Sequence, residues 1–131
     1  MIKAIIVDDE QHCIDRVVNL LNEYADRIVL AASCNTVDSA LKTIADLNPD
    51  VVFLDVHLQG ETGFDFLAKL TNVDFEIVFT TAFDSYAVEA FRFSALDYLL
   101  KPVDKDEFAR AIEKIEKKKH KVSWYLLKFR K

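Results

Sequence analysis

Glycine and proline are scarce in this chain of 131 residues, which contains two of each. Both glycines, Gly60 and Gly63, fall in one short segment, so the sequence lacks a glycine-rich loop that would cradle the phosphates of a nucleotide. No apolar run approaches the roughly 18 residues that a membrane-spanning helix needs, and no charged leader with an apolar segment precedes the first apolar run. We therefore expect a soluble, cytoplasmic protein that binds neither nucleotides nor membranes.

Cysteine and histidine are also rare, and their spacing argues against both stabilising disulfides and a structural zinc site. Cys13 and Cys34 are far apart and form no Cys-x-x-Cys pair, and the three histidines are scattered at His12, His57 and His120. This pattern supports neither a disulfide framework nor a zinc site. We expect both cysteines to be reduced and buried as small apolar side chains.

Charge is divided unevenly along the chain. Residues 1–113 contain 9 Lys and Arg against 21 Asp and Glu, whereas residues 114–131 contain 8 against 1. An acidic body argues against direct nucleic-acid binding, because contacts to phosphates need Lys and Arg on the docking face. With 51% hydrophobic residues, the chain is long enough for one compact domain. We expect that domain over residues 1–119, followed by a basic, aromatic tail over residues 120–131.

Apolar runs alternate with segments that have apolar residues at helical spacing. The runs are continuous, which is typical of strands buried on both faces of a parallel sheet. The predicted strands are residues 3–7, 28–33, 51–54, 76–80 and 96–100. The predicted helices contain residues 14–21, 37–44, 63–70, 85–94 and 108–115. This repeated βα order predicts a flavodoxin-like α/β fold, in which a five-stranded parallel sheet of order 2-1-3-4-5 has helices on both faces.

Charged and hydroxyl side chains stand where the predicted strands end. Asp8 and Asp9 follow the first strand, Asp55 the third, Thr81 the fourth and Lys101 the fifth. The carboxyl ends of parallel strands meet at one edge of a sheet, so these residues form one candidate site. Three converging carboxylates raise each other's pKa unless a cation neutralises them, and Mg²⁺ prefers such oxygen ligands. A carboxylate beside a metal can also accept a phosphoryl group, with a lysine and a hydroxyl contacting its oxygens.

The motifs at these strand ends resemble those of the receiver domain of bacterial response regulators. The resemblance covers residues 1 to about 119 through Val7-Asp8-Asp9-Glu10, Phe53-Leu54-Asp55, Phe79-Thr80-Thr81-Ala82 and Asp97-Tyr98-Leu99-Leu100-Lys101-Pro102. It implies a signalling switch, not an enzyme that acts on other substrates.

The resemblance also implies a role for each site residue. Asp55 accepts a phosphoryl group from a sensor histidine kinase, Asp9, Asp55 and the backbone carbonyl of His57 hold Mg²⁺, and Asp8 supports the metal through water. Thr81 and Lys101 contact the phosphoryl group, Tyr98 is an aromatic switch, and the Lys101–Pro102 peptide bond is cis. A homodimer through the face of the fourth helix, fifth strand and fifth helix is a possible output.

Residues 79–91 and 95–102 resemble receivers that precede a LytTR-type DNA-binding domain. That domain is not in this chain, so DNA is expected as a partner only through a missing effector domain. The sequence departs from the family at Gln59, where a proline is usual. The side chain of His57 either faces incoming water and influences the lifetime of the acyl phosphate, or is exposed without a kinetic role.

Most of these site residues also have a simpler structural interpretation. Asp8 and Asp9 would cap a helix, Thr81 would be a turn residue, Lys101 a solvated lysine and Tyr98 an ordinary half-buried aromatic. Residues 117–121 would be a solvated helix end, and residues 122–129 would extend the last helix, pack on a second copy or begin an effector domain.

Two other functions remain open at this point. One is an interaction module that no longer signals. The other is a Mg²⁺-dependent phosphohydrolase with an aspartyl intermediate, which normally has a second acid where this chain has His57.

Overall fold

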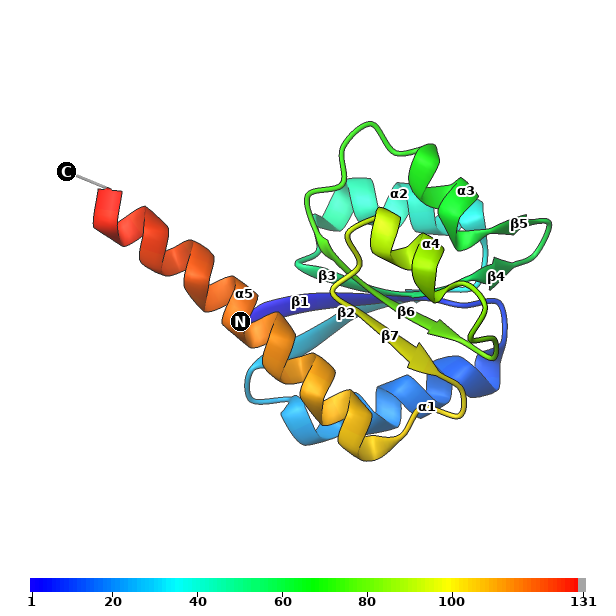
Figure 1. The fold of residues 1–131 in the computed structure, drawn as a ribbon, viewed down its shortest axis with the longest axis horizontal. Coiled ribbons are helices and arrows are strands. Elements are labelled where there is room, and N and C mark those ends of the chain that lie inside the picture. Colours follow the sequence, from blue (N-terminus) through cyan, green and yellow to red (C-terminus); the bar gives the residue numbers. More distant parts are fainter. Residues whose placement is uncertain (130–131) are drawn as a thin grey trace.

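A five-stranded parallel sheet forms the centre of the computed structural model, which describes the backbone of residues 1–129 and the side chains of residues 1–120 (Figure 1). Its strands are β1 (Ile2–Val7), β2 (Ile28–Cys34), β3 (Val51–Asp55), β6 (Glu76–Thr81) and β7 (Asp97–Leu100). They lie in the order β2-β1-β3-β6-β7 and pair in parallel throughout. Counted over the parallel strands alone, this is the predicted order 2-1-3-4-5, and the α/β fold is confirmed.

A small antiparallel hairpin, which the sequence did not predict, follows β3. It consists of β4 (His57–Leu58) and β5 (Glu61–Thr62). Gly60, in the turn between them, has a φ of 84°, a left-handed conformation that favours glycine. Gly63 follows the hairpin, and a Cβ added to it would lie 2.5 Å from the backbone oxygen of Asp55. The two glycines therefore let the chain turn back closely against the end of β3.

Helices cover both faces of the sheet (Figure 1). Helices α1 (Gln11–Leu21) and α5 (Lys105–Phe129) lie on one face, with the short 3-10 helix η1 (Asn22–Tyr24) after α1. Helices α2 (Val37–Leu47), α3 (Gly63–Ala68) and α4 (Ala87–Arg92) lie on the other. Both α3 and α4 are shorter than predicted. The apolar pattern of the third helix extends to Leu70, but this residue packs against the core from the loop that follows α3.

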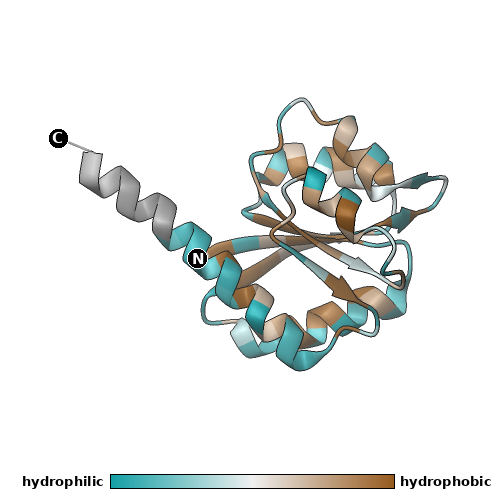
Figure 2. Ribbon diagram, viewed as in Figure 1, coloured by the Kyte–Doolittle hydropathy of each residue, from teal (hydrophilic) through white to brown (hydrophobic). Residues whose placement is uncertain are grey.

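Each face of the sheet has its own apolar core (Figure 2). On the α1 and α5 face, the rings of Phe53 and Phe108 stack with centroids 5.6 Å apart. On the other face, Phe64 packs against Phe79 with centroids 5.0 Å apart. Strands β1, β3 and β6 are buried almost throughout, as expected for central strands. The edge strand β2 instead alternates buried with more exposed residues, and the other edge strand, β7, has only Leu99 buried. The prediction of burial on both faces is therefore wrong for these two strands.

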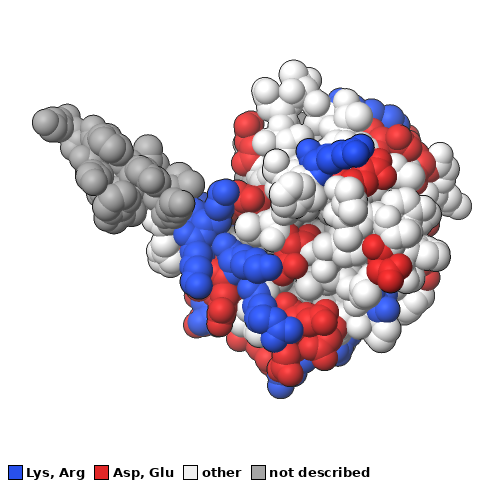
Figure 3. Space-filling model, in the orientation of Figure 1, with Lys and Arg blue, Asp and Glu red and all other residues white. Residues whose placement is uncertain are grey.

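Helix α5 runs without interruption through the predicted boundary between residues 119 and 120 and extends beyond the edge of the sheet (Figure 1). Lys119 pairs with Asp50 at 2.7 Å, which ties the helix to the amino-terminal end of β3. Basic side chains gather on this helix beside acidic ones (Figure 3). The side chains of the apolar stretch at residues 122–129 lie outside the described residues. None of the described helices combines the length and apolar character needed to cross a membrane.

Candidate functional site

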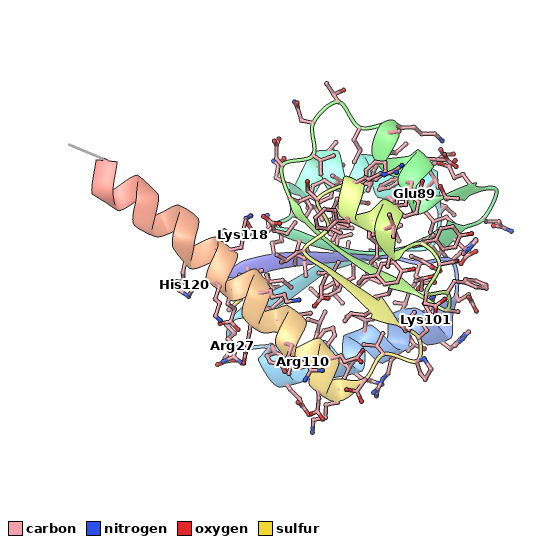
Figure 4. All side chains as sticks on the ribbon, viewed as in Figure 1. Arg27, Glu89, Lys101, Arg110, Lys118 and His120 are labelled. Carbon is pink, nitrogen blue, oxygen red and sulfur yellow. The ribbon has the colours of Figure 1, made fainter. Side chains whose placement is uncertain are left out.

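One lysine ammonium bridges two buried carboxylates at the carboxyl ends of the strands. Asp55 is the last residue of β3, and Asp8 follows β1. Lys101 follows β7 (Figure 4). The Nζ atom of Lys101 lies 2.9 Å from Oδ2 of Asp8 and 3.0 Å from Oδ2 of Asp55. Asp8 and Asp55 are only 2% and 3% exposed. The interpretation of Lys101 as a solvated surface lysine is therefore wrong.

Burial and charge act in opposite directions on this triad. Burial raises the pKa of Asp55 above its ordinary value, and the negative charge of Asp8 adds to the shift, although the hydrogen bond from Lys101 opposes it. Burial alone would lower the pKa of Lys101, but hydrogen bonds to Asp8 and Asp55 outweigh it and the pKa is raised. Lys101 therefore stays protonated, and its single charge leaves one of the two carboxylates uncompensated.

Two further acidic side chains, Asp9 and Glu10, lie beside the two carboxylates of the triad. The carboxylates of Asp8, Asp9, Glu10 and Asp55 offer oxygen atoms that all lie within 4.8 Å of one another. An all-oxygen set with excess negative charge is suited to a hard divalent cation such as Mg²⁺. The predicted metal residues Asp8, Asp9 and Asp55 thus come together. Glu10 is an addition that the sequence analysis missed, although it is the third acid of the run that begins at Asp8.

The main chain after β3 also contacts the site. The backbone N–H of His57 donates to Oδ1 of Asp55 at 3.1 Å. The side chain of His57 is exposed, and its ring packs edge-on against Phe83 at 4.9 Å and Tyr86 at 5.1 Å between centroids. This side chain therefore covers the loop between β6 and α4.

Thr81 and Tyr98 meet at the backbone of one residue in that loop. The buried Oγ1 of Thr81 accepts a hydrogen bond from the N–H of Phe83 at 3.3 Å, and the hydroxyl of Tyr98 donates to the carbonyl of Phe83. The N–H of Lys101 donates to the carbonyl of Thr81 at 2.8 Å, which joins β6 to the end of β7. Phe83 was not singled out from the sequence, because its role depends on backbone groups and not on its side chain.

A cavity of about 310 Å³ opens beside Lys101, between α1 and the loop after β7. The Lys101–Pro102 peptide bond in that loop is cis. Arg16 donates from Nε and Nη2 to the carbonyl of Val103, at 3.1 and 2.8 Å, and so holds the loop against α1.

Cys13 lines this cavity and is only partly buried, so the expectation that both cysteines are buried is wrong for Cys13 and holds for Cys34. Both thiols are free. Burial raises the pKa of the Cys13 thiol, while the nearby Lys101 ammonium acts in the opposite direction.

A doubly wound α/β sheet with an acidic site at the carboxyl ends of its central strands defines the class of this protein. The response regulator receiver domain family matches residues 4–113, and the chain belongs to this family. It is thus a phosphorylation-dependent signalling domain, as the resemblance implied. Receiver domains generally bind Mg²⁺ at their acidic pocket and interact with histidine kinases.

Relatives of known sequence include regulators named for sensory transduction. The sensory transduction protein LytT of Bacillus subtilis (strain 168) is 40% identical over 119 residues, which cover 89% of this chain and 49% of the relative. An uncharacterised response regulatory protein of Vibrio cholerae is 38% identical over 126 residues, which cover 95% of this chain and 52% of the relative. The chain therefore spans about half the length of these relatives.

Solved structures of receiver domains share the fold. The response regulatory domain of mrkE from Klebsiella pneumoniae superposes with a TM-score of 0.80 at 28% identity. The match covers 88% of this chain and 96% of the mrkE domain. The REC domain of AraT, a response regulator from Geobacillus stearothermophilus, superposes with a TM-score of 0.81 at 26% identity. The match covers 92% of this chain and 97% of the AraT domain.

Proposed function

We propose that Asp55 is the residue that accepts the phosphoryl group, and that its phosphorylation changes the contacts this domain makes. The observation that carries the proposal is the placement of Asp55: it is buried at the end of β3, with Oδ2 on Lys101 and Oδ1 on the N–H of His57. In the transfer, an Asp55 oxygen bonds to phosphorus while the bond from phosphorus to the kinase histidine breaks. The chain then catalyses only its own phosphorylation and dephosphorylation.

The acidic cluster supports a metal role for the same residues. Asp9, Asp55 and the backbone carbonyl of His57 would hold Mg²⁺, with Asp8 acting through a bound water. When bound, the cation supplies positive charge that offsets the charge on the transferring group. Lys101 provides a second positive charge from the strand β7 side and contacts a phosphoryl oxygen after transfer.

Thr81 and Tyr98 are proposed to report phosphorylation to the surface. The hydroxyl of Thr81, which now accepts from Phe83, would turn to donate to a phosphoryl oxygen. The hydroxyl of Tyr98 donates a hydrogen bond to the carbonyl of the same Phe83, so movement of the loop between β6 and α4 releases or reorients the Tyr98 side chain. Such differential contacts shift a two-state equilibrium, with typical couplings of about 1–3 kcal/mol.

The face formed by α4, β7 and α5 is the proposed output surface, through which two phosphorylated copies would pair. Val88 and Phe91 on α4 are 73% and 83% exposed, and Leu100 on β7 is 42% exposed. Lys114 and Asp97 form an ion pair of 3.2 Å on the neighbouring part of this face. Exposed apolar side chains next to charge pairs are typical of a surface that binds a partner.

We further propose that residues 1–119 are the receiver and that residues 120–131 lead to an effector domain absent from this chain. The relatives, which are about twice as long, support this division. Any binding to DNA, and any role in transcription, would belong to that second domain. The proposed setting is the cytoplasm, where a sensor histidine kinase delivers the phosphoryl group.

Intact mass spectrometry after incubation with acetyl phosphate, with and without Mg²⁺, tests the central proposal. We expect a Mg²⁺-dependent gain of one phosphoryl group, which Asp55→Asn abolishes. The matched control Asp46→Asn, at an exposed acid on α2, should keep the gain. Phosphoryl incorporation into Asp55→Asn equal to that of the wild type would contradict the assignment. Repeated turnover of phosphomonoesters would favour the phosphohydrolase, and absence of incorporation under all conditions would favour the interaction module.

A further inference from the structure

We propose that Glu10, His12 and Cys13 form a binding site for a transition-metal cation of the Zn²⁺ class. One carboxylate oxygen, one imidazole nitrogen and one sulfur from these residues all lie within 4.8 Å of one another. The proposed phosphoryl transfer uses neither His12 nor Cys13, and Glu10 is the one residue that this group shares with the acidic cluster. The inference therefore does not rest on the proposed function.

The separation of two of the ligand atoms suits a tetrahedral cation. Nε2 of His12 lies 3.5 Å from Oε2 of Glu10. In a tetrahedral zinc site with bonds of about 2.0–2.2 Å to nitrogen and oxygen, two ligand atoms lie about 3.4 Å apart. Without a cation, this contact contributes little to stability, because the two side chains are 79% and 53% exposed.

The local chain brings the three ligands together at low entropic cost. Glu10 is the residue before α1, and His12 and Cys13 lie in its first turn, so all three fall within four consecutive positions. In the described structure, the side chain of Glu10 makes no capping hydrogen bond to α1. The backbone N–H of Glu10 instead donates to Oδ1 of Asp8 at 3.0 Å. The Glu10 carboxylate could therefore bind a cation without breaking a helix-capping hydrogen bond.

Space for a fourth ligand is present. Glu10, His12 and Cys13 all line the cavity of about 310 Å³ beside Lys101. Zinc sites with three protein ligands complete their coordination with a water or another small ligand. The cavity can admit that molecule without displacing Asp55 from Lys101.

Ligand chemistry separates this site from the neighbouring acidic one. Imidazole and thiolate favour Zn²⁺ and related cations, whereas Mg²⁺ favours oxygen alone. On ligation the Cys13 thiol releases its proton to solvent, and the thiolate and the Glu10 carboxylate then offset the charge of the cation. Glu10 belongs to both groups of possible ligands, so binding must be measured with Mg²⁺ already in excess.

Calorimetric titration of the full chain with Zn²⁺, in buffer with excess Mg²⁺, tests the site. We expect one Zn²⁺ per chain, and an affinity that falls about tenfold or more in each of His12→Ala and Cys13→Ser. The matched controls His120→Ala and Cys34→Ala should bind like the wild type, since His120 lies on α5 far from Lys101 (Figure 4) and Cys34 is buried. With Co²⁺ as a probe, the near-ultraviolet absorption of a thiolate ligand should appear in the wild type and vanish in Cys13→Ser.

Two results would overturn the proposal. The first is that His12→Ala and Cys13→Ser bind Zn²⁺ as tightly as the wild type does, which would place the cation on the carboxylates alone. The second is that the wild type binds no Zn²⁺. Asp55→Asn should retain Zn²⁺ binding, so a failure of the phosphorylation assay and a failure of this proposal are distinguishable.

Discussion

Lys101 carries one positive charge between two buried carboxylates, so the site holds an excess negative charge when both acids are ionised. Because the pKa of Asp55 is raised, the folded state binds this proton more tightly than the unfolded chain does. The stability that Asp55 contributes is therefore greatest at acidic pH and is lost as pH rises through its folded pKa. Above that pKa, ionised Asp55 lowers the stability of the folded state.

Asp55→Asn should consequently stabilise the metal-free protein at neutral pH. The substitution leaves Lys101 paired with Asp8 alone and removes the uncompensated charge, for a gain on the order of 1 kcal/mol in the free energy of unfolding. The gain should shrink at acidic pH, because wild-type Asp55 becomes protonated as pH falls through its raised pKa. Urea unfolding at the two pH values measures both effects.

An exposed acid outside the site provides the control for this prediction. Asp46→Asn, on α2, should change the free energy of unfolding by less than about 0.5 kcal/mol, as surface substitutions usually do. A loss of stability in Asp55→Asn at neutral pH would show that the Lys101 contact outweighs burial of the charge.

At the scale of elements, the short helix α3 depends on its amino-terminal cap. Oγ1 of Thr62 accepts from the N–H of Asp65 at 3.1 Å, and Oδ2 of Asp65 accepts from the N–H of Thr62 at 3.1 Å, which forms a capping box. The next residue, Gly63, donates its N–H to the carbonyl of Val56 at 2.6 Å. The cap therefore fixes both α3 and the loop beside Asp55.

Thr62→Ala should lower the free energy of unfolding by about 1 kcal/mol, because it leaves the N–H of Asp65 without its side-chain partner. Thr62→Ser, which retains the hydroxyl, should stay close to the wild type. Urea unfolding of the three proteins provides the comparison. Equal losses in both variants would indicate that the methyl group of Thr62, and not its hydroxyl, supports the helix.

At the scale of the whole molecule, the proposed output face can be tested by introducing charge. Val88→Glu combined with Phe91→Glu should keep the phosphorylated chain monomeric, because pairing would bury two unpaired carboxylates. Phosphoryl incorporation should be unchanged, since both residues are exposed on α4. Size-exclusion chromatography with light scattering after acetyl phosphate treatment measures the assembly.

Val73→Glu is the matched control for that experiment. Val73 is 43% exposed and lies in the loop between α3 and β6, outside the proposed face. It should pair like the wild type. If the wild type stays monomeric when fully phosphorylated, or if the α4 double variant still pairs, the proposed face is wrong.

Much of the fold followed from periodicity, because continuous apolar runs and helical spacing report burial directly. The prediction failed where burial was partial. Strand β2 lies at the edge of the sheet, so its apolar run is not covered on both faces. The hairpin of β4 and β5 was missed because each strand has only two residues, too few for any period to appear.

The sequence by itself determined the order of strands and helices, and placed Asp8, Asp55 and Lys101 at one edge, because the carboxyl ends of parallel strands must meet there. Only the tertiary structure decided their contacts. Lys101 and Asp55 are 46 positions apart, so their pairing depends on how β3 and β7 pack and where each side chain turns. The same holds for Glu10, His12 and Cys13: they match no metal-binding spacing in the sequence, and only the turn into α1 brings their three ligand atoms together.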